Sequence, residues 1–386
     1  DATKRVYEVK FTYDTYEKTS RYANNGQGIH GTLPTAEELL GAGYNPKLTY
    51  AINFGNFTAT TPVTEDKSVD VTVTGTFDIA SKEDWKAFCD IVNSGQNAVD
   101  AKMTADVDLE TEIKMLGYGK SYSGTFDGQN HTLTLNWDAG STSWRAPFYV
   151  VEGATIKNLR VKGSIKSDKK GHAGLIQSAY GTVAVSNCVS EVNITSSYNE
   201  GSSDVAGMAA YIYSGSVVTF DDCIVKGTLK ATTDKGKKAV SGFVHGQHGT
   251  CTLNNCLYIG ENNATGGNTF AANATINNCY YLNACGKAQG EPVTKEQLKS
   301  GYVAHKLQGT REETVWGQVL GTDNEPQLSA TAKHVYKVAF TYNGKEVASR
   351  YANRGGNVGT LPTPQEILGA SITATTVPPP PRSTCS

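Results

Sequence analysis

The sequence predicts an all-β protein whose centre is a right-handed parallel β-helix with short capping helices. A small, mostly-β domain and a truncated second copy of that domain are expected to flank it. Two observations carry this prediction: a short phrase recurs through the middle of the chain, and a longer repeat joins its two ends. A repeat of about 20 to 50 residues indicates a solenoid, whose units bury their apolar sides only by stacking on one another.

The N-terminal region, residues 1–78, is expected to form the small domain. Apolar and polar residues alternate in Val69–Phe77. A period of two is typical of a strand with one buried face, so this run is expected to be a strand. A short helix is expected near Thr35–Leu40.

A second helix is expected where the central region, residues 79–330, begins. Ser81 can cap its N-terminus, and the acidic residues that follow suit the helix dipole. One side of this helix is apolar: Trp85, Phe88, Cys89, Ile91 and Val92. We expect the helix to cover the first coil, because uncovered strand edges promote aggregation.

The recurring phrase consists of an apolar residue, two polar residues, and then Leu or Cys. These last positions lie 29, 35, 33 and 23 residues apart, and the residues after them alternate as strands do. Stacked units would place the second polar residue of each phrase at one corner, where Asn readily adopts a positive φ. The five copies of the phrase are Ile156–Leu159, Val185–Cys188, Phe220–Cys223, Leu253–Cys256 and Ile276–Cys279.

The cysteines are expected to be mostly buried and reduced. Leu159 fills the position that Cys takes in the other four copies, and exchange of Leu and Cys indicates an apolar interior site. Parallel side chains on stacked strands do not have the geometry that a disulfide prefers. Cys251 is also expected to point inward, and Cys385 to be exposed.

The C-terminal part is expected to hold a second cap, a partial repeat and a tail. Thr294–Leu307 should cover the far end of the solenoid. Residues 331–371 repeat the N-terminal domain in part, since Lys4–Tyr13 returns at Lys333–Tyr342 and Gly31–Ala42 at Gly359–Ala370. Residues 372–386 form a Pro-rich tail with polyproline II character.

The glycine positions in the central region add a resemblance to a known family. Gly174-Leu-Ile, Gly207-Met-Ala and Gly242-Phe-Val each precede a polar pair of the phrase at a similar distance. In this respect residues 77 to 328 resemble bacterial GLUG-motif repeat proteins. The resemblance implies a right-handed parallel β-helix and a secreted or cell-surface setting, and it implies little about activity.

A search for catalytic or metal-binding constellations finds none, so no catalytic, cofactor-binding or metal-binding residue is assigned. Each candidate group has a simpler structural explanation, as a turn, a corner or a solvated loop. The groups considered are Asp106 with Asp108, Asp221 with Asp222, Asp222 with Glu261, His245 with His248, and His131.

The tyrosines offer a different kind of site, because exposed aromatic rings can bind sugars or a partner protein. Tyr258 and Tyr281 occupy inward positions by their alternation. Tyr180 lies near the same corner as Tyr211 and Tyr213. Tyr211, Tyr213 and Tyr280 are the candidates for a binding surface.

The composition reduces the number of function classes that the chain could belong to. A net charge of −2 gives no reason to expect binding to nucleic acid, and no apolar run is long enough to span a bilayer. We therefore expect a non-catalytic module of a modular bacterial surface or secreted protein, either an adhesin-like stalk or a binding or assembly unit, whose partner is a host or environmental glycan or protein. The alternatives are a β-helix polysaccharide lyase or glycoside hydrolase, and a self-assembling extracellular filament subunit whose partners are sister subunits.

Overall fold

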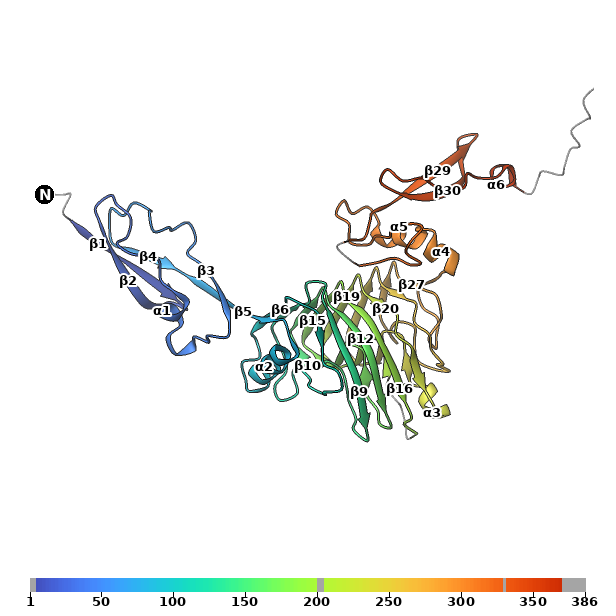
Figure 1. The fold of residues 1–386 in the computed structure, drawn as a ribbon, viewed down its shortest axis with the longest axis horizontal. Coiled ribbons are helices and arrows are strands. Elements are labelled where there is room, and N and C mark those ends of the chain that lie inside the picture. Colours follow the sequence, from blue (N-terminus) through green and yellow to red (C-terminus); the bar gives the residue numbers. More distant parts are fainter. Residues whose placement is uncertain (1–4, 200–204, 329–330, 370–386) are drawn as a thin grey trace, which may run out of the picture.

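The centre of the molecule is a stack of parallel strands in which successive coils build two long faces and a shorter third face (Figure 1). A computed structural model describes residues 5–199, 205–328 and 331–369. The predicted all-β class with parallel, solenoid-like stacking is confirmed. Within the described part of the chain, every helix is too short or too polar to cross a lipid bilayer.

The first face contains the strand that ends at the recurring phrase, and the second face contains the strand that follows it. The first face consists of β5 Thr72–Ile79, β6 Asp100–Met103, β8 Thr125–Asp127, β11 Thr155–Lys157, β15 Thr182–Ser186, β19 Val217–Asp221, β24 Thr250–Asn254 and β26 Thr275–Asn277. The second consists of β7 Val107–Asp108, β9 Thr132–Gly140, β12 Arg160–Ser167, β16 Val189–Ser196, β20 Ile224–Val225, β25 Leu257–Tyr258, β27 Tyr280–Tyr281 and β28 Glu291–Pro292, with β21 Leu229–Ala231 beside β16.

The third face carries the strands that lead back to the first. It consists of β10 Phe148–Glu152, β14 Ile176–Tyr180, β18 Ala209–Ile212 and β23 Val244–Gln247. A short neighbouring sheet, β13 His172–Ala173, β17 Val205–Ala206 and β22 Val240–Ser241, connects the second face with the third. The short helix α3, Asp234–Lys237, lies in one of these connections.

The corner between the first and second faces is the predicted polar corner. All five residues there have φ between 51° and 53°: Asn158, Asn187, Asp222, Asn255 and Asn278. Asn and Asp tolerate this left-handed conformation better than other residues with a side chain. The local sequence therefore fixes where each coil turns.

The interior is one continuous apolar core that includes the thiol column of Cys188, Cys223, Cys256 and Cys279. Seven described cysteines, these four with Cys89, Cys251 and Cys285, are free and buried, as the sequence predicts for the column and for Cys251. Burial raises the pKa of Cys251 to about 12, because an apolar interior disfavours a thiolate.

These thiols should resist alkylation as long as the protein is folded. We expect iodoacetamide near neutral pH to leave all seven described cysteines unmodified, since their side chains are buried and the reagent cannot reach them while the protein is folded. After denaturation all eight cysteines of the chain should react. Mass spectrometry of the two samples measures this, and labelling of any of the seven in the folded protein would contradict it.

The helix α2, Lys82–Asn93, closes the N-terminal end of the core as predicted. Ser81 caps it by accepting a hydrogen bond from the backbone N–H of Asp84. Trp85 and Phe88 of this helix are fully buried and pack against the first coils. The antiparallel strand β3, Thr49–Asn53, pairs with β5 and covers the first edge of the first face.

The N-terminal domain is built on the hairpin of β1, Val6–Tyr13, and β2, Tyr16–Asn24. The predicted short helix is α1, Ala36–Leu40, capped by Thr35 and followed by a 3₁₀ turn, η2 Gly41–Gly43. One prediction here is wrong: Val69–Phe77 is not a single strand. It is divided between β4, Lys67–Asp70, which pairs with β1, and β5, which enters the solenoid. The expected domain boundary at residue 78 consequently falls inside β5.

The predicted position of the second cap is also wrong. The helices α4, Lys295–Lys299, and α5, Tyr302–Gln308, do not cover the far end but lie along the side of the solenoid, over the polar corner (Figure 1). The reason is an apolar stripe on the outer surface of the second face. Side chains of α4, α5 and the segment after them bury this stripe, which consists of Val189, Ile224, Leu257 and Tyr280.

The C-terminal partial repeat forms the hairpin of β29, Val335–Tyr342, and β30, Lys345–Asn353, with the helix α6, Pro364–Leu368. It reproduces polar contacts of the N-terminal copy. Arg350 pairs with Glu366 at 2.8 Å, as Arg21 pairs with Glu38 at 2.7 Å. The Pro-rich tail, including Cys385, lies outside the described residues.

Candidate functional site

The carboxylates and histidines considered from the sequence have structural partners. Asp106 accepts hydrogen bonds from His131 Nδ1 at 3.1 Å and from the backbone N–H of Thr132 at 2.9 Å. Asp108 accepts one from the backbone N–H of Glu110. These contacts hold turns between coils.

The remaining candidate groups do not assemble into a site. Asp222 contacts the C-terminal segment. Glu261 is exposed, and its backbone carbonyl accepts a hydrogen bond from the backbone N–H of Leu229. His245 lies 3.4 Å from the hydroxyl of Ser241, and His248 is exposed. Among the described residues, no three His, Cys, Asp or Glu side chains are grouped so that they could hold a metal ion.

The polar corner carries a ladder of side-chain amides that is interrupted once. Asn187 donates to Oδ1 of Asn158 at 3.3 Å, and Asn278 donates to Oδ1 of Asn255 at 2.8 Å. Asp222 has no amide with which to donate in the same way, and Oδ1 of Asn187 is buried without a hydrogen-bond partner within the described part of the chain. Asp222 therefore breaks the ladder.

Asp222 instead anchors the C-terminal segment. Both of its oxygens accept from Arg311 Nη1, at 2.9 and 2.8 Å, and Oδ1 also accepts from the indole N–H of Trp316 at 2.6 Å. Nearby, Lys226 pairs with Glu325 of the same segment at 2.6 Å. The Asp222 carboxylate thus adds a polar anchor to the apolar contacts that hold the segment on the side of the solenoid.

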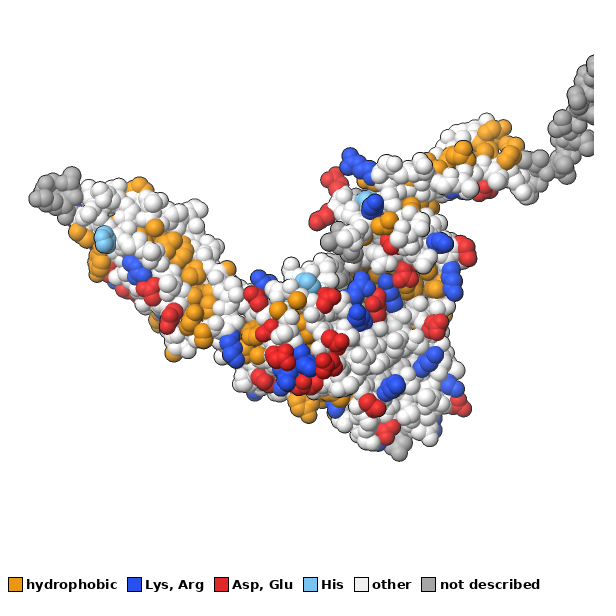
Figure 2. Space-filling view, viewed as in Figure 1, with side chains coloured by type: hydrophobic (Ala, Val, Ile, Leu, Met, Phe, Trp, Pro, Cys, Tyr) orange, Lys and Arg blue, Asp and Glu red, His pale blue; other side chains and the backbone are white. Residues whose placement is uncertain are grey.

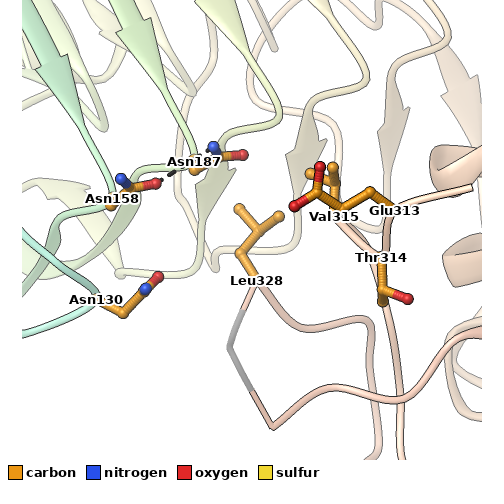
Figure 3. Close-up of a pocket in the computed structure, with 7 residues that line it drawn as sticks. All are labelled: Asn130, Asn158, Asn187, Glu313, Thr314, Val315 and Leu328. Atoms are coloured by element: carbon orange, nitrogen blue, oxygen red, sulfur yellow. Dashed lines mark hydrogen bonds between the residues drawn. The ribbon is translucent and has the colours of Figure 1, made fainter. Parts of the chain in front are cut away.

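A hollow of about 230 Å³ remains between the corner and this segment (Figure 3). Asn130, Asn158 and Asn187 lie on one side of it, and Glu313 and Leu328 lie on the other. The side chains of Asn158 and Asn187 hydrogen-bond to each other in the ladder. We regard this hollow as part of the packing between the segment and the solenoid.

Aromatic side chains gather on the outside of the third face and form what we call the aromatic surface. Its members come from successive coils: Tyr118, Trp144, Tyr149, Tyr180, Tyr211 and Tyr213. The rings of Tyr180 and Tyr213 stack at 4.2 Å, and those of Tyr118 and Tyr149 lie 5.0 Å apart. Burial, and then contact with Tyr213, raise the pKa of Tyr180 to about 12, so this ring is uncharged at neutral pH.

The aromatic surface encloses a hollow of about 380 Å³ with a polar floor. Gln177 and Ser178 form that floor and are only 4% and 3% exposed. The Ser178 hydroxyl donates to Oε1 of Gln177 at 2.7 Å. Apolar walls with a few polar groups inside are typical of a ligand site.

Trp144 differs from the other tryptophans in two ways. It is 40% exposed, whereas Trp85, Trp137 and Trp316 are buried. It also has a φ of 62°, a conformation that is costly for a bulky residue. Its indole lies against Gly171, where a Cβ would overlap the ring.

The sequence predicted part of this site. Tyr211 and Tyr213 are surface residues of the hollow, as expected, and Tyr258 is buried, also as expected. The expectation for Tyr280 is wrong, because the C-terminal segment covers it. The sequence did not predict three further residues of this site, which are Trp144, Gln177 and Ser178. The positive φ of Trp144 and the pairing of neighbouring strands in the third face place them there.

Comparison with known proteins gives little guidance. No family model matches the chain, and no curated protein matches it. One solved structure is similar, a "putative immunoglobulin A1 protease" from Bacteroides ovatus, with 14% identity over 66% of this chain and 92% of that chain and a TM-score of 0.44. A likeness this distant carries no argument about function.

Proposed function

We propose that the protein is a non-catalytic binding module of a bacterial surface or secreted protein, and that it binds a carbohydrate on the aromatic surface. The single observation that carries this proposal is the hollow with aromatic walls and a polar floor on the third face. Aromatic rings offer flat apolar faces to the C–H groups of a sugar, and the floor offers hydrogen bonds to its hydroxyls.

Two further observations support this proposal over an enzyme. The carboxylates that a lyase or hydrolase could use are engaged in turns or, for Asp222, in holding the C-terminal segment. A glycosidase needs two facing carboxyl groups at a suitable separation, and the hollow has none among its lining residues. The extracellular setting, the right-handed coiling and the membership in GLUG-motif repeat proteins belong to the same proposal.

Glycan binding and its loss in two variants test the proposal. We expect Trp144→Ala and Tyr213→Ala each to weaken binding of a glycan identified on an array by roughly fivefold, since an aromatic contact contributes about 1 kcal/mol. Isothermal titration calorimetry measures the affinities, and reducing-end release is assayed on the same polysaccharides.

The matched control is Tyr16→Ala, which removes an exposed tyrosine from the N-terminal hairpin. It should leave the affinity unchanged. Equal binding by the wild-type protein and both surface variants would contradict the proposed site. Release of reducing ends would contradict the non-catalytic assignment.

The C-terminal hairpin favours self-assembly as a second function. In the N-terminal copy β1 pairs with both β2 and β4, whereas among the described residues β29 pairs only with β30. Val338 is consequently 36% exposed, although its counterpart Val9 is fully buried. Figure 2 shows hydrophobic side chains gathered over this hairpin. We propose that β29 pairs with the same strand of a second molecule, because an unpaired strand edge is a template for such pairing.

This second function predicts a mass that depends on concentration. Light scattering after size exclusion should give a dimer at high protein concentration and a monomer at low concentration. Val338→Lys should keep the protein monomeric, because a charge on the open edge opposes pairing. Tyr16→Lys is the control on the N-terminal hairpin, and a wild-type protein that stays monomeric throughout would rule the idea out.

A further inference from the structure

Arg145 lies beside the aromatic surface, and none of the described carboxylates forms an ion pair with it. It follows Trp144 and lines a second hollow, of about 260 Å³, together with Lys114 and Tyr118. Its Nη1 donates to the backbone carbonyls of Ser143 and Trp144, both at 3.2 Å. Its Nε is buried and has no hydrogen-bond partner within the described residues, and no carboxylate described there lies within ion-pair distance of the guanidinium.

The surroundings of Arg145 leave its charge uncompensated. The other cation of this hollow, Lys114, pairs with Asp90 at 2.5 Å. Burial lowers the pKa of the Arg145 guanidinium from its ordinary value, and only the hydroxyls of Tyr118 and Tyr149 act in the opposite direction. A half-buried cation with weak partners is costly, and an anion placed beside it would be favourable.

The two hollows belong to one continuous surface. Tyr149 lines the larger hollow and Tyr118 lines the smaller, and their rings lie 5.0 Å apart. Trp144 and Arg145 are consecutive residues that line one hollow each. A sugar chain lying on the rings would therefore bring a substituent to the guanidinium.

We propose that Arg145 binds the carboxylate of an acidic sugar whose rings lie on the aromatic surface. This inference rests on the proposed carbohydrate-binding function and names the class of ligand. A guanidinium matches a carboxylate in shape and can donate two parallel hydrogen bonds to it. One such cation suits a ligand that places a single carboxylate at this point of the site.

A carboxylate at the opposite end of the site favours one orientation of the ligand. Glu152 pairs in register with Tyr180, so its carboxylate lies near the Tyr180 end of the larger hollow. A carboxylate of the ligand would be repelled there and attracted at Arg145. Such a repulsive group helps to select one orientation.

The test compares acidic polysaccharides with neutral ones of the same backbone. Polygalacturonate, alginate and hyaluronan are each titrated beside a sample whose carboxyl groups have been reduced to alcohols. We expect carboxyl reduction to weaken binding of the preferred polymer by roughly tenfold or more, since a hydrogen bond to a charged group contributes about 1.5–3 kcal/mol. Arg145→Gln should reproduce this loss for the acidic polymer and leave the affinity for its reduced form unchanged.

Three variants make the result specific. Arg145→Lys keeps the charge and should retain part of the preference, which also guards against a folding defect. Lys162→Gln makes the same charge change on the second face and should have no effect. Tyr213→Ala should weaken binding of the acidic and reduced forms alike.

The outcomes separate this inference from the function on which it rests. Binding of neutral polymers that is insensitive to carboxyl reduction and to Arg145→Gln would overturn the role of Arg145 and leave the aromatic site intact. Stronger binding of a sulfated polymer such as dextran sulfate would overturn the carboxylate assignment. Binding of none of these polymers would overturn both.

Discussion

Replacing Trp85 by alanine is expected to destabilise the protein by about 3–5 kcal/mol, the range for removing a large aromatic side chain from a packed core. Trp85 is fully buried, and its ring meets those of Phe126 and Phe148 edge-on, at 5.9 and 6.1 Å. Its indole N–H donates to the backbone carbonyl of Lys114 at 3.0 Å. The substitution would open a cavity where α2 closes the first coils.

Urea unfolding followed by circular dichroism measures this loss. The matched control is Trp144→Ala, because Trp144 is exposed and outside the core. Its effect on stability should stay within about 0.5 kcal/mol, as for most surface substitutions. A change of less than about 1 kcal/mol for Trp85→Ala would mean that α2 is not needed to close the solenoid.

Replacing Asp222 by alanine should release the C-terminal segment from the side of the solenoid. The change removes the acceptor of Arg311 and Trp316 and leaves a guanidinium without its partner. Loss of one member of a partly buried ion pair costs about 3 kcal/mol. We expect faster hydrogen exchange in α5 and faster tryptic cleavage after Arg311.

Two further variants at acidic positions sharpen this prediction. Asp222→Asn keeps an acceptor for Trp316 and restores an amide that can donate to Asn187, so its effect should be smaller than that of alanine. Asp234→Ala removes an almost fully exposed carboxylate on α3 and should change neither readout. Unchanged exchange in α5 after Asp222→Ala would refute the anchoring role.

Features that depend on residues close together in the sequence were predicted well. The corner turns follow from Asn or Asp at positions such as Asn187 and Asp222, where the backbone has a positive φ. The helix α2 follows from its cap at Ser81 and its apolar side. The inward direction of the thiol column follows from alternation and from the exchange of Leu with Cys.

Features that depend on neighbouring coils could not be predicted. Val189 and Tyr280 are outward-pointing residues in their own strands, and the apolar stripe that draws α4 and α5 to the side exists only once the coils are stacked. The aromatic surface likewise joins Trp144 to Tyr213, which lie in different coils. The segments that link the strands differ in length from coil to coil. The spacing of residues in the sequence therefore does not give the register in which strands of neighbouring coils pair.

The sequence by itself determined the stacked architecture, its corner, its closed N-terminal end and the kinship of the two end domains. These follow from alternation, caps and backbone preferences, which act over a few residues. The tertiary structure alone decided that Asp222 holds the C-terminal segment and that Arg145 lies beside the aromatic rings with no carboxylate partner among the described residues. Both depend on which side chains of distant segments meet across the stack, and contacts of that kind are set by packing rather than by local preference.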